Sequence, residues 1–145
     1  MNVQAMEIRE VWGAVKPHIE EIMQAMPWRD FHLEDLYAQC QNGQAVLFVD
    51  SDVPRGTSFF IAKIKKNEVG ETILFIWIAY SENPDTVAES QKAIEEIARS
   101  AGCVAIETLL FNAEVAEHAR QFGFDQQMFL VRKVLRTEGG ISGAE

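Results

Sequence analysis

The chain has 145 residues, of which 48% are hydrophobic and 24% are charged. This is the size and composition of one globular domain, so a single hydrophobic core is expected. The net charge of −9 at pH 7 argues against a nucleic-acid partner, because binding to phosphates needs clustered lysines and arginines. The only short basic cluster is Lys63, Lys65 and Lys66, and it suits the solvated end of a strand.

The sequence predicts a cytoplasmic protein. Residues 1–10 lack a basic region followed by an apolar run, which is the pattern of a signal peptide. The longest apolar stretch, residues 73–80, is far shorter than the roughly 20 residues that a membrane helix needs, so no membrane partner is expected. Cys40 and Cys103 are expected to be free thiols in this compartment, with a disulfide as the alternative.

The first part of the chain predicts helices. Apolar residues recur at three- and four-residue steps from residue 8 to residue 26, which indicates an amphipathic helix. Pro17 interrupts this pattern and either kinks one helix or begins a second, since a proline inside a helix removes a backbone hydrogen bond. Asp30 or His32 then precedes a short helix at residues 33–41. No clear strand comes before the first helix.

Strands follow. Residues 44–50, 58–65 and 71–80 are rich in β-branched and aromatic residues, so they predict three strands that can pair antiparallel. Residues 66–70 are predicted to form the hairpin loop between the last two of these strands. Residues 52–56, with Pro54 and Gly56, are predicted to form a turn.

The second half of the chain alternates helices and strands. The predicted elements after the break at Pro84 are a helix from residue 87 that ends at Gly102, a strand at 104–111, a helix at 114–122 and a last strand at 127–135. The glycine-rich tail, residues 136–145, is expected to be disordered. This order predicts one α/β domain over residues 1–135, with a mixed, mostly antiparallel central sheet, helices on both faces and a right-handed βαβ crossover.

Residues 111–124 read FNAEVAEHARQFGF. This stretch resembles the closing half of the GNAT family of N-acetyltransferases, in which a strand ends in Asn, a short helix follows, and Gly-Phe leads into the final strand. Asn112, Gly123 and Phe124 occupy those places in register. The element order from about residue 32 to 135 also matches the family, whereas the beginning departs from it, because no clear first strand precedes the first helix.

Three further stretches are similar to the small GNAT-like proteins that tailed phages and prophages encode. They are residues 76–79 (IWIA), residues 101–103 (AGC) and residues 106–107 (IE), with an acidic helix between the first two. This similarity implies a phage protein.

The resemblance implies acetyl-CoA as cofactor. The family holds the coenzyme A pyrophosphate on backbone N–H groups at a helix N-terminus, with the pattern Arg/Gln-x-x-Gly-x-Gly/Ala just after the fourth strand. The equivalent residues here are 85–90, where Asp85 replaces the Gln or Arg, Ala88 replaces glycine, and Ser90 replaces the closing small residue. The cofactor motif is therefore eroded, and weak or absent binding is expected.

Two carboxylates are also expected to weaken the binding of the pyrophosphate. Asp85 and Glu89 would face the phosphate position and would cost on the order of 1 kcal/mol each if exposed. The alternative is that Asp85 or Thr86 caps the helix, whose dipole favours acidic residues in its first turn. An Asp85→Gln substitution distinguishes the two, because it should tighten acetyl-CoA binding only if the cradle lies here.

The resemblance also implies catalytic positions. The family's general acid is a Tyr seven residues after the Asn, and here that position is Ala119. His118 is adjacent and can donate a proton, although one residue is a rotation of about 100° on a helix. Glu107 is the candidate general base, with an outward-facing strand residue as the alternative. The backbone of Ile78, Ala79 and Tyr80 would hold the pantetheine chain. Ala88 and Ser90, in the stretch equivalent to the pyrophosphate motif, and Asn112 are the other candidate cofactor-binding residues.

Two functions stay open at this point. The first is transfer of an acetyl group from acetyl-CoA to an amine substrate, and the second is a non-catalytic, phage-associated binding or assembly module on the same fold. No metal is expected, because helix capping explains the acidic and histidine residues at positions 30–35. The large apolar residues of the first helical segment, Trp12, Trp28 and Met23 among them, also suggest a homodimer or a protein partner, through the N-terminal helices or an edge strand. Their alternative use is to cover the sheet face.

Overall fold

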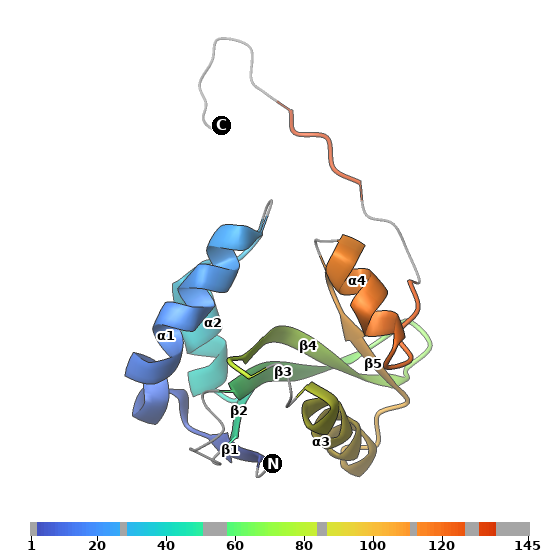
Figure 1. Ribbon diagram of the computed structural model, residues 1–145, viewed down its shortest axis with the longest axis horizontal. Coiled ribbons are helices and arrows are strands. Elements are labelled where there is room, and N and C mark those ends of the chain that lie inside the picture. The colour runs from blue at the N-terminus through green and yellow to red at the C-terminus, as the bar shows by residue number, and fades with distance from the viewer. Residues whose placement is uncertain are drawn as a thin grey trace.

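A computed structural model describes residues 3–26, 29–50, 58–83, 87–110, 113–126 and 131–135. The elements are, in chain order, β1 (Val3–Met6), α1 (Ile8–Ala25), α2 (Leu33–Gln41), β2 (Val46–Asp50), β3 (Ser58–Lys66), β4 (Thr72–Ser81), α3 (Val87–Ser100), β5 (Ala105–Thr108) and α4 (Ala113–Arg120) (Figure 1).

The five strands form one sheet in the order β1-β2-β3-β4-β5. The first four pair antiparallel with their sequence neighbours, and β5 pairs parallel to β4. A parallel neighbour needs a crossover connection, and α3 supplies it. Figure 1 shows α3 on one side of the sheet and α1, α2 and α4 on the other. The mixed, mostly antiparallel sheet with helices on both faces confirms the predicted fold class.

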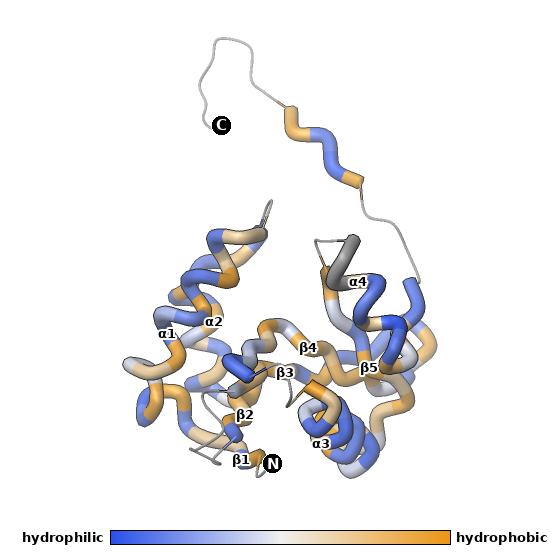
Figure 2. Tube along the Cα trace, in the orientation of Figure 1, coloured by the Kyte–Doolittle hydropathy of each residue, from blue (hydrophilic) through white to orange (hydrophobic). Residues whose placement is uncertain are grey.

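Two apolar clusters, one on each face of the sheet, hold the helices in place. The cluster under α1 and α2 includes Ile19, Leu36 and Ile61, each 0% exposed. The cluster under α3 includes Phe60 and Ile94. Figure 2 shows apolar and polar residues alternating along α1 and α3, as expected of helices with one buried face.

Pro17 lies inside α1, which runs as one helix of 18 residues. Of the two alternatives that the sequence left open, a single helix is therefore the correct one. The buried residues of α1 are Ile8, Val15, Ile19 and Met23, all on one side of the helix. This burial outweighs the hydrogen bond that the proline removes.

The prediction that no strand precedes the first helix is wrong. β1 pairs antiparallel with β2, from Val3 opposite Asp50 to Met6 opposite Leu47. The strand is only four residues long and its middle residues, Gln4 and Ala5, are exposed, so it lacks the apolar run of a central strand. With β1 in place, the departure from the GNAT order at the start of the chain disappears.

The predicted last strand is not formed in the part that the structure describes. Residues 131–135 have no regular secondary structure, and Val131, Val134 and Leu135 are 89%, 71% and 81% exposed. A strand needs an edge to pair with, and residues 131–135 are not part of the described sheet, so their β-rich composition alone did not suffice. The predicted turn at 52–56, the break at Pro84, residues 127–130 and the tail at 136–145 lie outside the described residues.

None of the helices that the structure describes combines the length and the apolar composition that crossing a bilayer would require.

Candidate functional site

β4 contains a β-bulge at Trp77. Ile61 of β3 pairs with Ile78, but its neighbour Ala62 pairs with Ile76, so Trp77 is an extra residue on β4. In a regular strand, successive side chains point to opposite faces. Here Trp77 and Ile78 both pack against the cluster under α1 and α2, because the bulge rotates the rest of the strand.

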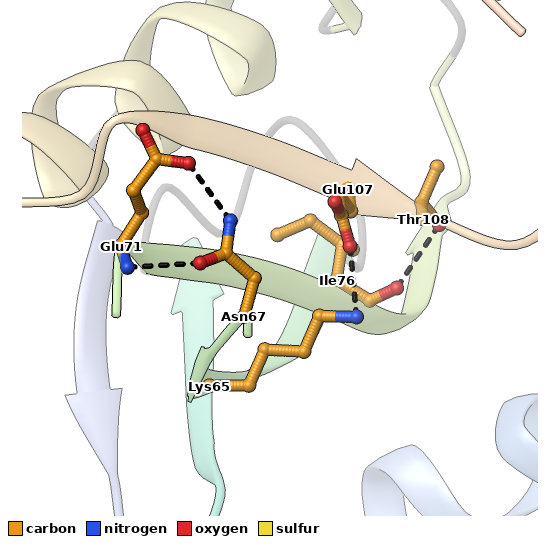
Figure 3. A network of polar contacts seen from close by, with 6 residues as sticks. All are labelled: Lys65, Asn67, Glu71, Ile76, Glu107 and Thr108. Atoms are coloured by element: carbon orange, nitrogen blue, oxygen red, sulfur yellow. Dashed lines mark hydrogen bonds and ion pairs between the residues drawn. The ribbon is translucent and has the colours of Figure 1, made fainter. Parts of the chain in front are cut away.

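Beyond the bulge, β4 and β5 separate. Their parallel pairing runs only from Ile73 opposite Ala105 to Ile76 opposite Thr108, whereas β4 continues to Ser81. The Thr108 hydroxyl donates a hydrogen bond of 3.0 Å to the Ile76 carbonyl and closes the last paired position (Figure 3). We call the opening beyond this position the β4–β5 fork. Residues 78–80 of β4 pair with β3 on one edge, but no described strand pairs with residues 77–80 on the edge that faces β5, so an extended ligand can bond to the backbone there.

The three residues that sequence analysis assigned to cofactor binding, Ile78, Ala79 and Tyr80, form the β4 side of this fork. Ile78 is 2% exposed and anchors the strand in the core, while Ala79 is exposed. The Tyr80 ring stacks on the His18 ring of α1, with 4.1 Å between centroids. The fork therefore has one wall that is fixed by packing.

The Tyr80 phenol remains protonated over a wide pH range. Partial burial raises its pKa above the ordinary value, and the carboxylates of Glu82 and Glu21 raise it further, because they disfavour a second negative charge. The phenol is thus a hydrogen-bond donor at the end of β4 at neutral pH and well above it.

Glu107 lies on β5 one residue before the fork. Its carboxylate is 2.8 Å from the Lys65 ammonium, and both side chains are about half exposed (Figure 3). Glu107 stands opposite Phe75, and the Lys65 ammonium lies 5.2 Å from the centre of the Phe75 ring. An ion pair of this kind requires the ionised carboxylate, which is the form that can accept a proton.

The structure does not bring Glu107 and His118 together. His118 is exposed on α4 and its ring packs edge-on against Phe122, with 5.6 Å between centroids. Ala119, at the position of the family's general acid, is half-buried and has no proton to donate. Asn112 lies outside the described residues.

The first turn of α3 carries Ala88, Glu89 and Ser90. All three are part of the helix, which begins at Val87, and this turn contains no glycine and no basic residue. Glu89 supplies a negative charge where a pyrophosphate would need positive or neutral surroundings. Asp85 lies outside the described residues.

Sequence analysis did not predict that Trp77, the bulge residue, lies between Lys63 and Phe31. The Lys63 ammonium lies 3.9 Å from the centre of the Trp77 ring and donates a hydrogen bond of 3.2 Å to the Gln39 amide oxygen. Phe31 packs edge-on against Trp77, with 4.9 Å between the ring centroids. Burial lowers the pKa of Lys63, and the Asp30 carboxylate partly opposes this. The prediction of a solvated strand end holds for Lys66, which is exposed, but is wrong for Lys63, which is half-buried.

Both cysteines are free, and they pack on opposite faces of the sheet: Cys40 with the cluster under α1 and α2, Cys103 with the cluster under α3. Among the described residues no group of three or more His, Cys, Asp and Glu side chains could hold a metal. Instead, the His32 backbone N–H donates a hydrogen bond of 2.8 Å to the Asp35 carboxylate, so these residues begin α2 as predicted.

Cys40 should be a poorly reactive thiol. Burial raises its pKa to about 11, and the Lys63 charge offsets only part of this effect. At pH 8 the thiolate fraction is then about 100-fold below that of a thiol with the ordinary pKa of 9.0. We expect a Cys103→Ser variant, which retains only Cys40, to react with a thiol reagent about 100-fold more slowly when folded than in urea. Equal rates would show that Cys40 is accessible and ionisable.

No protein-family model matches the sequence, and comparison with curated proteins finds no match either. Solved structures, in contrast, match over nearly the whole chain. A ribosomal-protein-alanine N-acetyltransferase from Brucella melitensis biovar Abortus is 12% identical, with a TM-score of 0.66 over 92% of this chain and 100% of that one.

Two other structures give the same result. An aminoglycoside acetyltransferase from an uncultured soil metagenomic sample, in complex with sisomicin, is 9% identical and has a TM-score of 0.65 over 93% of this chain and 96% of that one. An acetyltransferase from Trypanosoma brucei is 15% identical, with a TM-score of 0.59 over 92% and 99% of the two chains. The chain therefore has the fold of the GNAT acetyltransferases.

Proposed function

We propose that this protein binds the pantetheine arm of acetyl-CoA in the β4–β5 fork and transfers the acetyl group to an amine. The observation that carries the proposal is the bulge at Trp77 followed by residues 77–80 of β4 with no described strand on their β5 side. Pantetheine is an extended chain with two amide groups, and an unpaired strand edge offers N–H and C=O groups to such a chain. The acetyltransferases of the same fold support this assignment.

The two ends of the cofactor fit this chain differently. The backbone of Ile78–Tyr80 suits the pantetheine arm, because it needs no particular side chain. The first turn of α3 does not suit the diphosphate, because Ala88 stands where the family has glycine and Glu89 adds a negative charge. We therefore propose that Ala88 and Ser90 contact the cofactor without forming a diphosphate cradle, and we expect a low affinity for acetyl-CoA.

Chemically, the cofactor supplies an acetyl group as a thioester. Glu107 is placed next to the fork, where its carboxylate can accept the proton that an attacking amine loses as the N–C bond forms and the C–S bond breaks. His118 is the nearest candidate in sequence to protonate the leaving thiolate, since Ala119 has no acidic group.

A non-catalytic binding or assembly module is the second candidate. Ala119 at the acid position and Glu89 at the diphosphate position favour it, because both remove chemistry that the fold's enzymes use. A role in a phage and a cytoplasmic location stay predictions from the sequence. The two candidates differ in one measurable property, which is the release of free thiol from acetyl-CoA in the presence of amines.

Calorimetric titration with acetyl-CoA tests the proposed site. We expect a Kd weaker than about 100 μM, equivalent to roughly −5.5 kcal/mol, because the diphosphate lacks its cradle. Ala79→Glu, which puts bulk and charge at the fork, should weaken binding at least about tenfold, or by about 1.4 kcal/mol. The matched control Ala101→Glu changes an exposed alanine in the turn that follows α3 and should leave the affinity unchanged.

Each outcome decides something. Low-micromolar affinity would show that the first turn of α3 does hold the diphosphate. No binding at millimolar acetyl-CoA would overturn the proposal in favour of the binding module. Equal losses in the two variants would show that the fork is not the binding site.

A further inference from the structure

Two lysines of β3 lie over aromatic rings of β4. The Lys63 ammonium is 3.9 Å from the centre of the Trp77 ring, and the Lys65 ammonium is 5.2 Å from the centre of the Phe75 ring. The two lysines are two residues apart on one strand, so their side chains point to the same face of the sheet. The groups that hold the two amines are nevertheless different.

A carboxylate holds Lys65, whereas a neutral amide holds Lys63. Figure 3 shows the Lys65 ammonium at the Glu107 carboxylate, 2.8 Å away. The Lys63 ammonium donates its hydrogen bond of 3.2 Å to the amide oxygen of Gln39, and its side chain is half-buried while Lys65 is exposed. A lysine that attacks an acyl group must first free its nitrogen. Lys65 then gives up an ion pair, and Lys63 gives up only a hydrogen bond to an uncharged group.

Burial also favours the reactive form of the Lys63 amine. Loss of water around the ammonium lowers the pKa of Lys63 from its ordinary value of 10.5, and the charge of Lys65 acts in the same direction. Asp30 and Cys40 oppose this shift, as does the face of the Trp77 ring. A lower pKa leaves more of the amine neutral at a given pH, and the neutral amine is the nucleophile.

We propose that Lys63 is an acetylation site of this protein, with acetyl-CoA as the acetyl donor. The neutral nitrogen attacks the thioester carbonyl, the N–C bond forms and the C–S bond breaks. The proton that the nitrogen loses ends on the released thiol, so the step needs no further reactant. Trp77, which the amine contacts, is the bulge residue at which the β4–β5 fork begins. The choice of donor rests on the proposed function, whereas the reactivity of Lys63 does not.

Acetylation of Lys63 would act on the wall of the fork. It replaces the ammonium with a neutral amide and so removes the cation–π contact with Trp77. The edge-on contact between Trp77 and Phe31 does not depend on this charge. The modification therefore changes what holds the first residue of the fork in place.

Chemical acetylation measures the reactivity of Lys63 without acetyl-CoA. The full chain, folded or in urea, is treated at pH 8 with a limiting amount of N-hydroxysuccinimidyl acetate, and peptide mass spectrometry gives the rate at each lysine. The internal controls are Lys65 and Lys92, which is exposed on α3. We expect the ratio of folded to unfolded rates to be at least about threefold higher for Lys63 than for either control. An equal or lower ratio at Lys63 would overturn the proposal.

Gln39→Glu tests the role of the neutral partner. It keeps the shape of the side chain but places a carboxylate beside the ammonium, which raises the pKa of Lys63, so the rate at Lys63 should fall at least about threefold. The matched control Gln91→Glu adds the same charge on α3, which packs on the opposite face of the sheet, and should leave the rate unchanged (Figure 1). An unchanged rate in Gln39→Glu, or equal losses in both variants, would contradict the proposal.

Incubation with millimolar acetyl-CoA then tests the donor. Lys63 of the folded chain should gain an acetyl group at least about threefold faster than Lys65 or Lys92, with one thiol released for each group. No acetyl group on Lys63 would overturn this inference, even if added amines are acetylated and the proposed function stands. Loss of the modification in Ala79→Glu would support a donor held in the fork. Unchanged modification in that variant would support Lys63 as the site but count against the fork.

Discussion

Replacing Ile61 with alanine should lower the free energy of unfolding by about 2–5 kcal/mol, the largest stability loss that we predict. Ile61 is 0% exposed, belongs to the cluster under α1 and α2, and stands opposite Ile78 where the register shifts. Its removal leaves a cavity between the helices and the bulged strand, and neighbours that are held on both sides cannot fill it. Urea unfolding followed by tryptophan fluorescence measures the change.

Ile64→Ala is the matched control for this substitution. Ile64 lies on the same strand but is 50% exposed, so its loss should change stability by about 0.5 kcal/mol or less. Similar losses in the two variants would mean that strand propensity, and not core packing, decides the stability of β3.

Glu107→Gln should reduce acetyl transfer to an amine by about 10²–10⁴-fold, the range that a positioned general base contributes. The amide keeps the shape of the side chain but cannot accept the proton. Stability should change by about 1 kcal/mol or less, because the ion pair with Lys65 is about half exposed. Release of free thiol at fixed acetyl-CoA, with a panel of polyamines, amino acids and lysine peptides, measures the rate.

Lys65→Gln distinguishes the role of Glu107 as a base from the role of its ion pair with Lys65. It breaks the same contact but keeps the carboxylate, so it should retain most of the activity that Glu107→Gln loses. Equal losses would show that the ion pair holds β5 in place and that Glu107 is not the base. Loss of activity in His118→Ala would identify His118 as the group that protonates the thiolate. An inactive wild-type protein would favour the binding module.

The helices and the central strands were predictable because their signals are local. The predicted helix at residues 33–41 coincides with α2, and the predicted strand at 58–65 is one residue shorter than β3. Spacing of apolar residues reports burial on one face, and it does so without knowledge of the partner. The same reasoning placed Ile78, Ala79 and Tyr80 at the end of β4, where the fork now lies.

What sequence analysis missed depends on contacts between distant residues. β1 is a strand because β2 offers it an edge, and its own composition gives no signal. The bulge at Trp77 appears only when the pairing with β3 is known. Lys63 looks like a surface residue until Trp77 and Gln39 are seen beside it. Conversely, residues 131–135 have a strand-like composition and form no strand in the described chain.

The short pairing of β5 with β4 has a consequence for how the molecule opens. β3 and β4 pair over nine positions, whereas β4 and β5 pair over four, from Ile73–Ala105 to Ile76–Thr108. Units with few pairings open at a lower free energy than the global unfolding transition, so the amide protons of β5 should exchange with deuterium well before those of β3. The fork therefore lies where a persistent unit, β1 to β4 with α1 and α2, meets one that opens more often. Its width can then change through brief local excursions of β5 while the wall formed by β4 stays in place.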